Sequence, residues 1–128
     1  NLNTTVVYTS TTNLYFNPAT GDFTAGGAIT AYSDARIKTD ITQISDALNN
    51  LLRLQGITYT RTDTGVKGRG FLAQEVQKVY PELVVENSQD KMLSVAYGNL
   101  TADIVESIRE LSRRVSNIEI VLGMKRGD

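Results

Sequence analysis

The stretch that decides the fold lies near the C-terminal end, where residues 97–122 have the sequence YGNLTADIVESIRELSRRVSNIEIVL. Apolar side chains recur there at alternating intervals of four and three residues, at Ile104, Ile108, Leu111, Val115, Ile118 and Leu122. This spacing is a heptad pattern, and Tyr97 and Thr101 extend it upstream. As one α-helix the segment would be about 39 Å long, more than the rest of so short a chain can cover. We therefore expect part of the apolar stripe to contact another chain.

The residue types in this stripe also indicate how many chains meet. β-Branched Ile and Val occupy both alternating positions of the seam. Such a mixture favours trimers or larger assemblies over dimers. The sequence thus predicts a long helix within residues 97–128 that forms a trimeric coiled coil through these six seam residues. The alternative is a long helix that folds back on its own domain.

Residues 1–32 differ from the rest of the chain, because Asn, Thr, Gly, Ala and aromatic residues dominate and Asp22 is the only charged side chain. Three runs have the length and the β-branched or aromatic composition of strands: Thr4–Tyr8, Asn13–Asn17 and Ala28–Tyr32. Residues 17–22 supply turn chemistry between two strands. Short strands with little charge are typical of a repetitive β-fibre. We expect 1–32 to be the C-terminal end of such a fibre.

From Ser33 onward the charge density rises and the pattern becomes mixed. We expect a helix at 45–55 capped by Ser45, a strand at 57–62, a mobile loop at 65–70, a helix at 71–80 ended by Pro81, and a hairpin of 83–86 with 92–95. The predicted fold class is α+β. A small mixed α/β globular part at 33–96 lies between the short β-fibre segment and the long C-terminal helix.

Composition excludes several functions. The 128 residues suit about one domain, and 13 basic against 14 acidic residues give a net charge of -1, so we expect no nucleic-acid partner. The chain has neither Cys nor His, which removes thiolate nucleophiles and the commonest metal ligand and general base. We expect no metal. No stretch approaches the roughly 18 apolar residues of a membrane span, so we expect a soluble chain without membrane contact.

The chemistry-bearing segment is residues 33–41, SDARIKTDI. A Ser can be activated by a Lys whose pKa is lowered from about 10.4 toward 7 or 8 by burial or a neighbouring cation. Arg36 offers the cation, whereas Asp34 opposes the shift if it pairs with Lys38. A spacing of five residues puts Ser33 and Lys38 on opposite faces of a strand and about 140° apart on a helix. They meet only across a turn or between subunits.

Three motifs now carry a resemblance. They are residues 33–41, residues 70–76 (GFLAQEV) running into 80–84 (YPELV), and residues 95–102 (VAYGNLTA). In this order they resemble the C-terminal intramolecular chaperone of phage tailspikes, endosialidases and tail fibres, including neck appendage proteins. The same module resembles the self-cleaving segment of a membrane-tethered myelin transcription factor. The resemblance covers nearly all of residues 33–128.

The resemblance implies a trimeric folding helper that is made as the last part of a fibre protein, aligns three chains and then releases itself by autoproteolysis. Ser33 matches the nucleophile and Lys38 the general base. Asp34 and Arg36 match motif positions that either hold the turn at the cut through a salt bridge or take part in catalysis directly. The implied cut lies between Ser33 and Asp34. Attack on the carbonyl of Tyr32 through a five-membered ring is the geometrically near alternative, and it cuts between Tyr32 and Ser33.

The implied partners are two further copies of the chain and its own upstream β-fibre as the folding client. The implied setting is a virion tail-appendage precursor assembled in the bacterial host cytoplasm, from which the chaperone part is released after cleavage. No cofactor is implied. Physical reasoning agrees, because register in low-charge strands is weakly specified and a trimeric coiled coil makes their pairing effectively intramolecular. Proteolysis would then make assembly one-way.

Three alternatives stay open. One is a structural trimerisation tip without proteolysis, in which Ser33 is only a turn or cap residue. Another treats residues 65–70, GVKGRG, as a nucleotide loop, although they lack the Gly-Lys-Ser/Thr ending of a phosphate-binding loop. The third is a receptor-binding tip, for which the chain has few aromatic residues. Gln74 and Glu75 are interpreted as a polar helix face rather than as part of a site.

Overall fold

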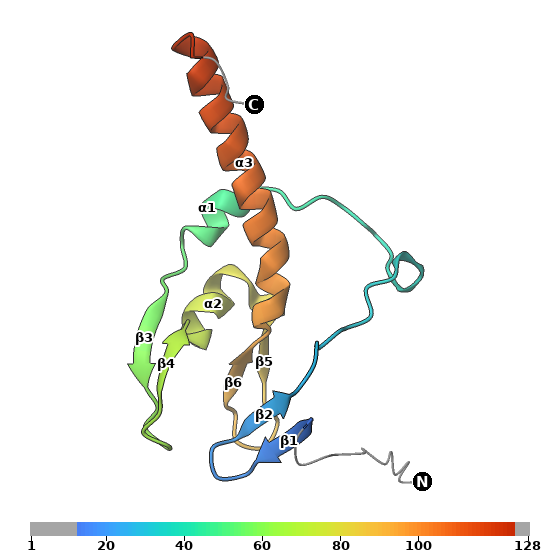
Figure 1. Cartoon of the computed structure of the whole chain (residues 1–128), viewed down its shortest axis with the longest axis vertical. Helices are drawn as coiled ribbons and strands as arrows, with labels where there is room; N and C mark the ends of the chain where they lie inside the picture. Colours follow the sequence, from blue (N-terminus) through green and yellow to red (C-terminus); the bar gives the residue numbers. More distant parts are fainter. Residues whose placement is uncertain (1–12, 125–128) are drawn as a thin grey trace. The chain divides into compact units, whose positions relative to one another are not determined.

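The computed structural model describes residues 13–124 and divides the chain into two compact units, 1–41 and 42–128 (Figure 1). The change in composition at Ser33 therefore falls inside the first unit. The run Thr4–Tyr8, expected to be a strand, lies outside the described residues.

Within residues 13–41 of the first unit, β1 (Leu14–Asn17) pairs antiparallel with β2 (Asp22–Ala25) to form a hairpin. The turn closes because Gly21 takes a positive φ of 78° and donates its N–H to the Asn17 carbonyl at 2.7 Å. The expected strand at Asn13–Asn17 is confirmed as β1. The expected strand at Ala28–Tyr32 is wrong, because these residues have no regular structure in the single chain. Strand propensity alone forms no ladder without a partner strand.

The second unit combines short helices, two hairpins and a long C-terminal helix, so the predicted mixed α and β class is confirmed. Its helices and strands are α1 (Ala47–Leu51), β3 (Ile57–Thr60), β4 (Lys67–Gly70), α2 (Ala73–Val79), β5 (Val84–Glu86), β6 (Leu93–Val95) and α3 (Leu100–Val121). The strands pair antiparallel as β3 with β4 and β5 with β6. The core cluster lies where α2 and the start of α3 meet, and its members are Val76, Tyr80, Leu83 and Leu100.

The first helix of the second unit is shorter than expected. α1 begins after Asp46, which is the N-cap residue in a left-handed conformation with φ 56°, so Ser45 does not cap it. Ala47 and Leu48 are buried, and α1 packs against α3. The position of α1 is therefore fixed by this packing rather than by a capping hydrogen bond.

The glycine-rich stretch at 65–70 is not the loop that was expected, because residues 67–70 form β4. Gly65 supplies the turn with a φ of +74°. Gly68 faces Tyr59 across the ladder, and a Cβ there would lie 2.6 Å from the Tyr59 ring. Gly70 lies against the Tyr97 hydroxyl, with no room for a Cβ. The spacing of these glycines therefore has a packing reason.

The long helix begins later than expected, because Tyr97–Asn99 form a 3-10 turn and α3 starts at Leu100. The Tyr97 ring stacks on Phe71 with 5.9 Å between centroids, and its hydroxyl accepts a hydrogen bond from the Phe71 N–H at 3.1 Å. Tyr97 thus ties the start of α3 to the junction of β4 and α2 rather than continuing the helical stripe.

Gly70→Ala should destabilise the second unit by about 1–3 kcal/mol, because the new methyl group displaces the Tyr97 hydroxyl from the Phe71 N–H. Gly56→Ala is the matched control, since a Cβ there meets nothing within 4 Å. Urea unfolding at one fixed protein concentration measures both variants. Equal midpoints for the two would contradict the packing role of Gly70.

Candidate functional site

Ser33 and Lys38 meet across a short turn. Residues Ala35–Ile37 form a 3-10 helix, in which Ile37 N–H bonds the Asp34 carbonyl at 3.2 Å and Lys38 N–H bonds the Ala35 carbonyl at 3.1 Å. This reversal brings Lys38 Nζ to 2.6 Å from Ser33 Oγ, to which it donates a hydrogen bond. In the single chain the two side chains thus meet across a turn, which is one of the two arrangements that the spacing left open.

Asp34 and Arg36 hold this turn. The Asp34 Oδ1 accepts from the Arg36 backbone N–H at 2.8 Å and from Arg36 Nε at 3.0 Å, while Oδ2 pairs with an Arg36 terminal nitrogen at 2.8 Å. The Arg36 side chain, and then its backbone N–H, lower the pKa of Asp34, and the same pairing raises the pKa of Arg36. The carboxylate thus caps the turn and engages Arg36. Among residues 13–124, Lys38 has no carboxylate partner.

The Ser33 site is open to solvent in the single chain. Every residue from 26 to 46 is exposed, including the apolar Tyr32, Ile37 and Ile41. A lysine general base needs burial or a neighbouring cation to favour its neutral form. The turn brings Ser33 and Lys38 into contact, and the described part of the single chain supplies no burial around them.

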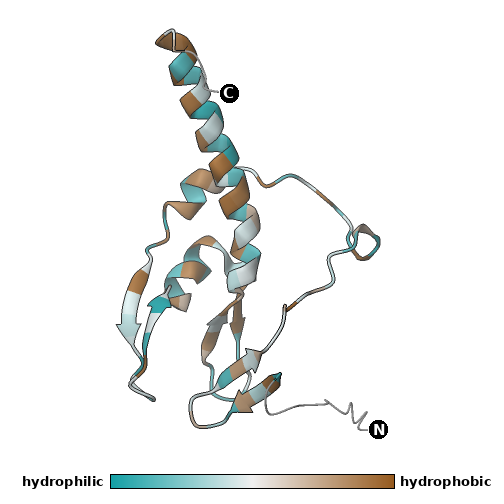
Figure 2. Ribbon diagram, viewed as in Figure 1, coloured by the Kyte–Doolittle hydropathy of each residue, from teal (hydrophilic) through white to brown (hydrophobic). Residues whose placement is uncertain are grey.

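The predicted seam on α3 is also exposed. Its six residues, Ile104, Ile108, Leu111, Val115, Ile118 and Leu122, are between 42% and 66% exposed. Figure 2 shows apolar positions along the part of α3 that extends beyond the rest of the second unit. About half of the surface of each seam residue therefore stays open to solvent in the single chain.

A different side of α3 packs on its own unit. Leu100, Asp103 and Ser107 are 3%, 9% and 2% exposed. Because an α-helix turns about 100° per residue, these three residues point about 70° away from the centre of the stripe. The helix does fold against its own unit, but not through the seam.

The sequence reasoning missed a buried polar contact under this side of α3. Tyr80 is 5% exposed, and burial together with the nearby Asp103 carboxylate raises its pKa to about 12. The hydroxyl oxygens of Tyr80 and Ser107 are both buried without a hydrogen-bond partner in the described part of the chain. Single aspartates and tyrosines carry no signal of burial in a sequence, so only the fold could show this contact.

The Tyr80 contact should make stability fall at high pH. Because the folded state binds the phenol proton more tightly than the unfolded state, its contribution is complete below the unfolded pKa of about 10 and is lost as pH rises toward 12. We expect a loss of up to about 1.4 kcal/mol per pH unit. Urea unfolding between pH 9 and 11.5 should show a shallower decline for Tyr80→Phe, with exposed Tyr59→Phe as control. Identical declines in the parent and in both variants would contradict the raised pKa of Tyr80.

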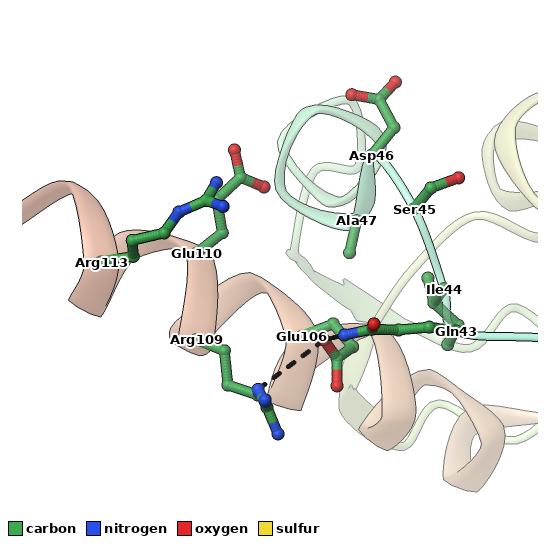
Figure 3. A pocket seen from close by; sticks show the side chains of 9 residues that line it. All are labelled: Gln43, Ile44, Ser45, Asp46, Ala47, Glu106, Arg109, Glu110 and Arg113. Carbon is green, nitrogen blue, oxygen red and sulfur yellow. Dashed lines mark hydrogen bonds and ion pairs between the residues drawn. The ribbon is translucent and has the colours of Figure 1, made fainter.

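A hollow of about 440 Å³ lies beside α3 in the second unit (Figure 3). It is lined by polar and charged side chains of both signs, with two apolar ones: Gln43, Ile44, Ser45, Asp46, Ala47, Glu106, Arg109, Glu110 and Arg113. Glu106 accepts from Gln43 at 3.1 Å and lies 3.9 Å from Arg109 Nε. These charges compensate one another, and the hollow selects no ligand of one sign.

The remaining sequence candidates are surface features. Gln74 and Glu75 are exposed on α2, and Glu75 pairs with Lys78 at 2.8 Å, as a polar helix face would. Over residues 13–124, no group of three or more His, Cys, Asp or Glu is placed to hold a metal ion. No helix in the described ranges is long and apolar enough to cross a membrane.

Comparison with known proteins places the Ser33 turn at the start of a known module. Residues 33–85 match a peptidase family model described as "Chaperone of endosialidase". Residues 33–85 are therefore similar to the chaperone-of-endosialidase family. The chaperone-of-endosialidase segment begins at Ser33, includes Lys38 and ends in β5. The resemblance drawn from the sequence motifs is confirmed.

Two phage proteins are similar over a longer stretch. Over 96 residues the chain is 32% identical to long tail fiber protein Gp37 of Enterobacteria phage K3 and to that of Enterobacteria phage T2. The alignments cover 68% of this chain but only 8% and 7% of the two fibre proteins. The chain therefore spans less than a tenth of the length of these relatives.

Proposed function

We propose that this chain is the end of a phage tail-fibre protein, and that residues 33–128 are an intramolecular chaperone which trimerises, registers the upstream fibre and then releases itself at Ser33. The observation that carries the proposal is that the family segment begins at the serine whose hydroxyl is bonded by Lys38 at 2.6 Å. The fibre relatives support a place in the virion tail. Assembly is proposed to take place in the host cytoplasm. No cofactor takes part in the proposed reaction.

The proposed chemistry uses the two paired side chains. The Ser33 hydroxyl gives its proton to the neutral Lys38 amine as Oγ attacks the Tyr32 carbonyl carbon through a five-membered ring. The peptide C–N bond breaks, the Ser33 nitrogen takes the proton back from Lys38, and an ester forms. Water then hydrolyses the ester, which restores the Ser33 hydroxyl and leaves Ser33 as a new amino terminus.

The cut between Ser33 and Asp34, which the family resemblance implied, needs a different attacker. Attack of Ser33 Oγ on its own carbonyl would close a four-membered ring, so a water or the serine of another copy would have to attack. The two routes leave released fragments that differ by one serine. The intact mass of the released fragment decides between them.

Assembly of several copies would supply the burial around Lys38 that the single chain lacks. Neighbouring copies that pack over residues 26–46 would desolvate Lys38 and favour its neutral form. They would also hold Ser33, Lys38 and a polarised carbonyl together, which an exposed turn does rarely. Cleavage is therefore proposed to follow trimerisation, after the fibre strands are in register.

A purely structural trimerisation tip is the second candidate, and the exposure of the Ser33 site favours it. In that case Asp34 and Arg36 only shape a surface turn, and the uncut chain persists after folding. The exposed seam supports trimerisation under both functions, so it does not separate them.

Ser33→Ala and Lys38→Ala should each abolish self-cleavage while the fold and the oligomer stay intact, because nucleophile and base are both required. Arg36→Ala should slow cleavage less, since it weakens only the support of the turn. Mass spectrometry of the folded parent and variants over time measures the cut. Cleavage at the parent rate in Lys38→Ala would remove Lys38 from the mechanism.

Leu111→Asp should abolish assembly, because three carboxylates would enter one apolar layer at a cost of several kcal/mol. Leu111 is 47% exposed in the single chain, so the fold of the second unit should survive, as circular dichroism can check. Sedimentation should show trimers for the parent and monomers for the variant, and the variant should remain uncut. A stable parent monomer at micromolar concentration would contradict the trimer.

A further inference from the structure

Two opposite charges flank the exposed stripe of α3 on its two sides. Arg114 directly precedes the seam residue Val115, and Glu119 directly follows the seam residue Ile118. At about 100° per residue, Arg114 points about 80° to one side of the centre of the stripe and Glu119 about 60° to the other. In heptad terms they occupy the two positions that border the core of a coiled coil, where interhelical salt bridges form.

The separation of this pair matches one arrangement of helices. In a parallel coiled coil in register, a residue at the position of Arg114 faces the residue five positions further along on the neighbouring helix. For Arg114 that residue is Glu119. In an antiparallel pair, positions of the same kind face each other, so arginine would not meet glutamate. We propose that Arg114 of each copy pairs with Glu119 of the neighbouring copy and thereby sets the direction and register of the helices. This rests on the trimer of the proposed function.

Both side chains are accessible in the single chain. Arg114 pairs with Glu110 of its own helix at 2.5 Å and remains 55% exposed, and its guanidinium has five donors, enough for a second carboxylate. Glu119 forms no ion pair with any residue of the described range 13–124. Arg113 is the last residue of α3 that lines the hollow of Figure 3, and residues 111–115 are exposed. Nothing of the chain's own core covers this part of the helix.

The pattern points to a second copy of this chain as the occupant of the stripe. Each copy offers an arginine on one side and a glutamate on the other, so a ring of identical helices closes with one such pair at every interface. A slip of one heptad in one direction places Arg114 opposite Ser112, which carries no charge, and a slip in the other carries it past the end of α3 at Val121. The pair exists only in register.

Charge reversal in the full chain tests the pair. Arg114→Glu places like charges at each interface, and the concentration at which the trimer half-dissociates in sedimentation should rise about tenfold at low salt. Arg113→Glu is the matched control, because it makes the same charge change on the side of the helix opposite the stripe and should leave that concentration unchanged. Glu110→Gln controls for the lost pair within the helix and should also have little effect.

The double variant Arg114→Glu with Glu119→Arg decides the matter, because it restores opposite charges only if these two residues meet between copies. We expect its half-dissociation concentration to return close to that of the parent. If the parent is a trimer but the double variant stays as weak as Arg114→Glu, or if Arg113→Glu weakens the trimer equally, the pairing is wrong and the trimer stands. If the parent itself sediments as a monomer, the proposed assembly is wrong.

Discussion

The long helix α3 packs against its own unit and leaves an apolar stripe open to solvent. α3 buries Leu100, Asp103 and Ser107 against its own unit and leaves its heptad stripe exposed on another side. Burying a large apolar side chain is worth about 1.5–3 kcal/mol, so six such residues in each copy are a strong drive toward association. The residues that α3 buries are not those of the stripe, so the fold of the second unit leaves the stripe available to other copies.

The sequence predicted best where the pattern depends on a single element. The heptad spacing required only helical geometry, and α3 formed where it placed the seam. The sequence predicted poorly where a segment's structure depends on the residues that pack or pair with it. Lys67–Gly70 carry no apolar or β-branched residue, yet they form β4 because Gly68 and Gly70 leave room for Tyr59 and Tyr97. Ala28–Tyr32 have strand composition and form no strand, since no strand within residues 13–124 pairs with them.

For the Ser33 turn, residue types and motif identified the participants, but spacing could not choose the geometry. The choice was made by Asp34, which accepts the Arg36 N–H and so starts the 3-10 turn that carries Lys38 back to Ser33. Arg36 of the motif accordingly forms its ion pair with Asp34. The amino-acid sequence carries no signal for the Tyr80–Asp103 contact, because this contact arises only when α2 and α3 pack together.

The exposure of the Ser33 turn and the exposure of the stripe have the same consequence for timing. A serine and a lysine already in contact need no large rearrangement to react, so under the proposed function the solvent around Lys38 would hold the reaction back in a single chain. If cleavage required only the turn, chains would be cut before they were aligned and the chaperone would be lost too early. If the Ser33 turn is buried only when the α3 stripes of three copies pack together, cleavage can occur only after the chains are aligned. The order of events would then follow from burial alone, with no separate trigger.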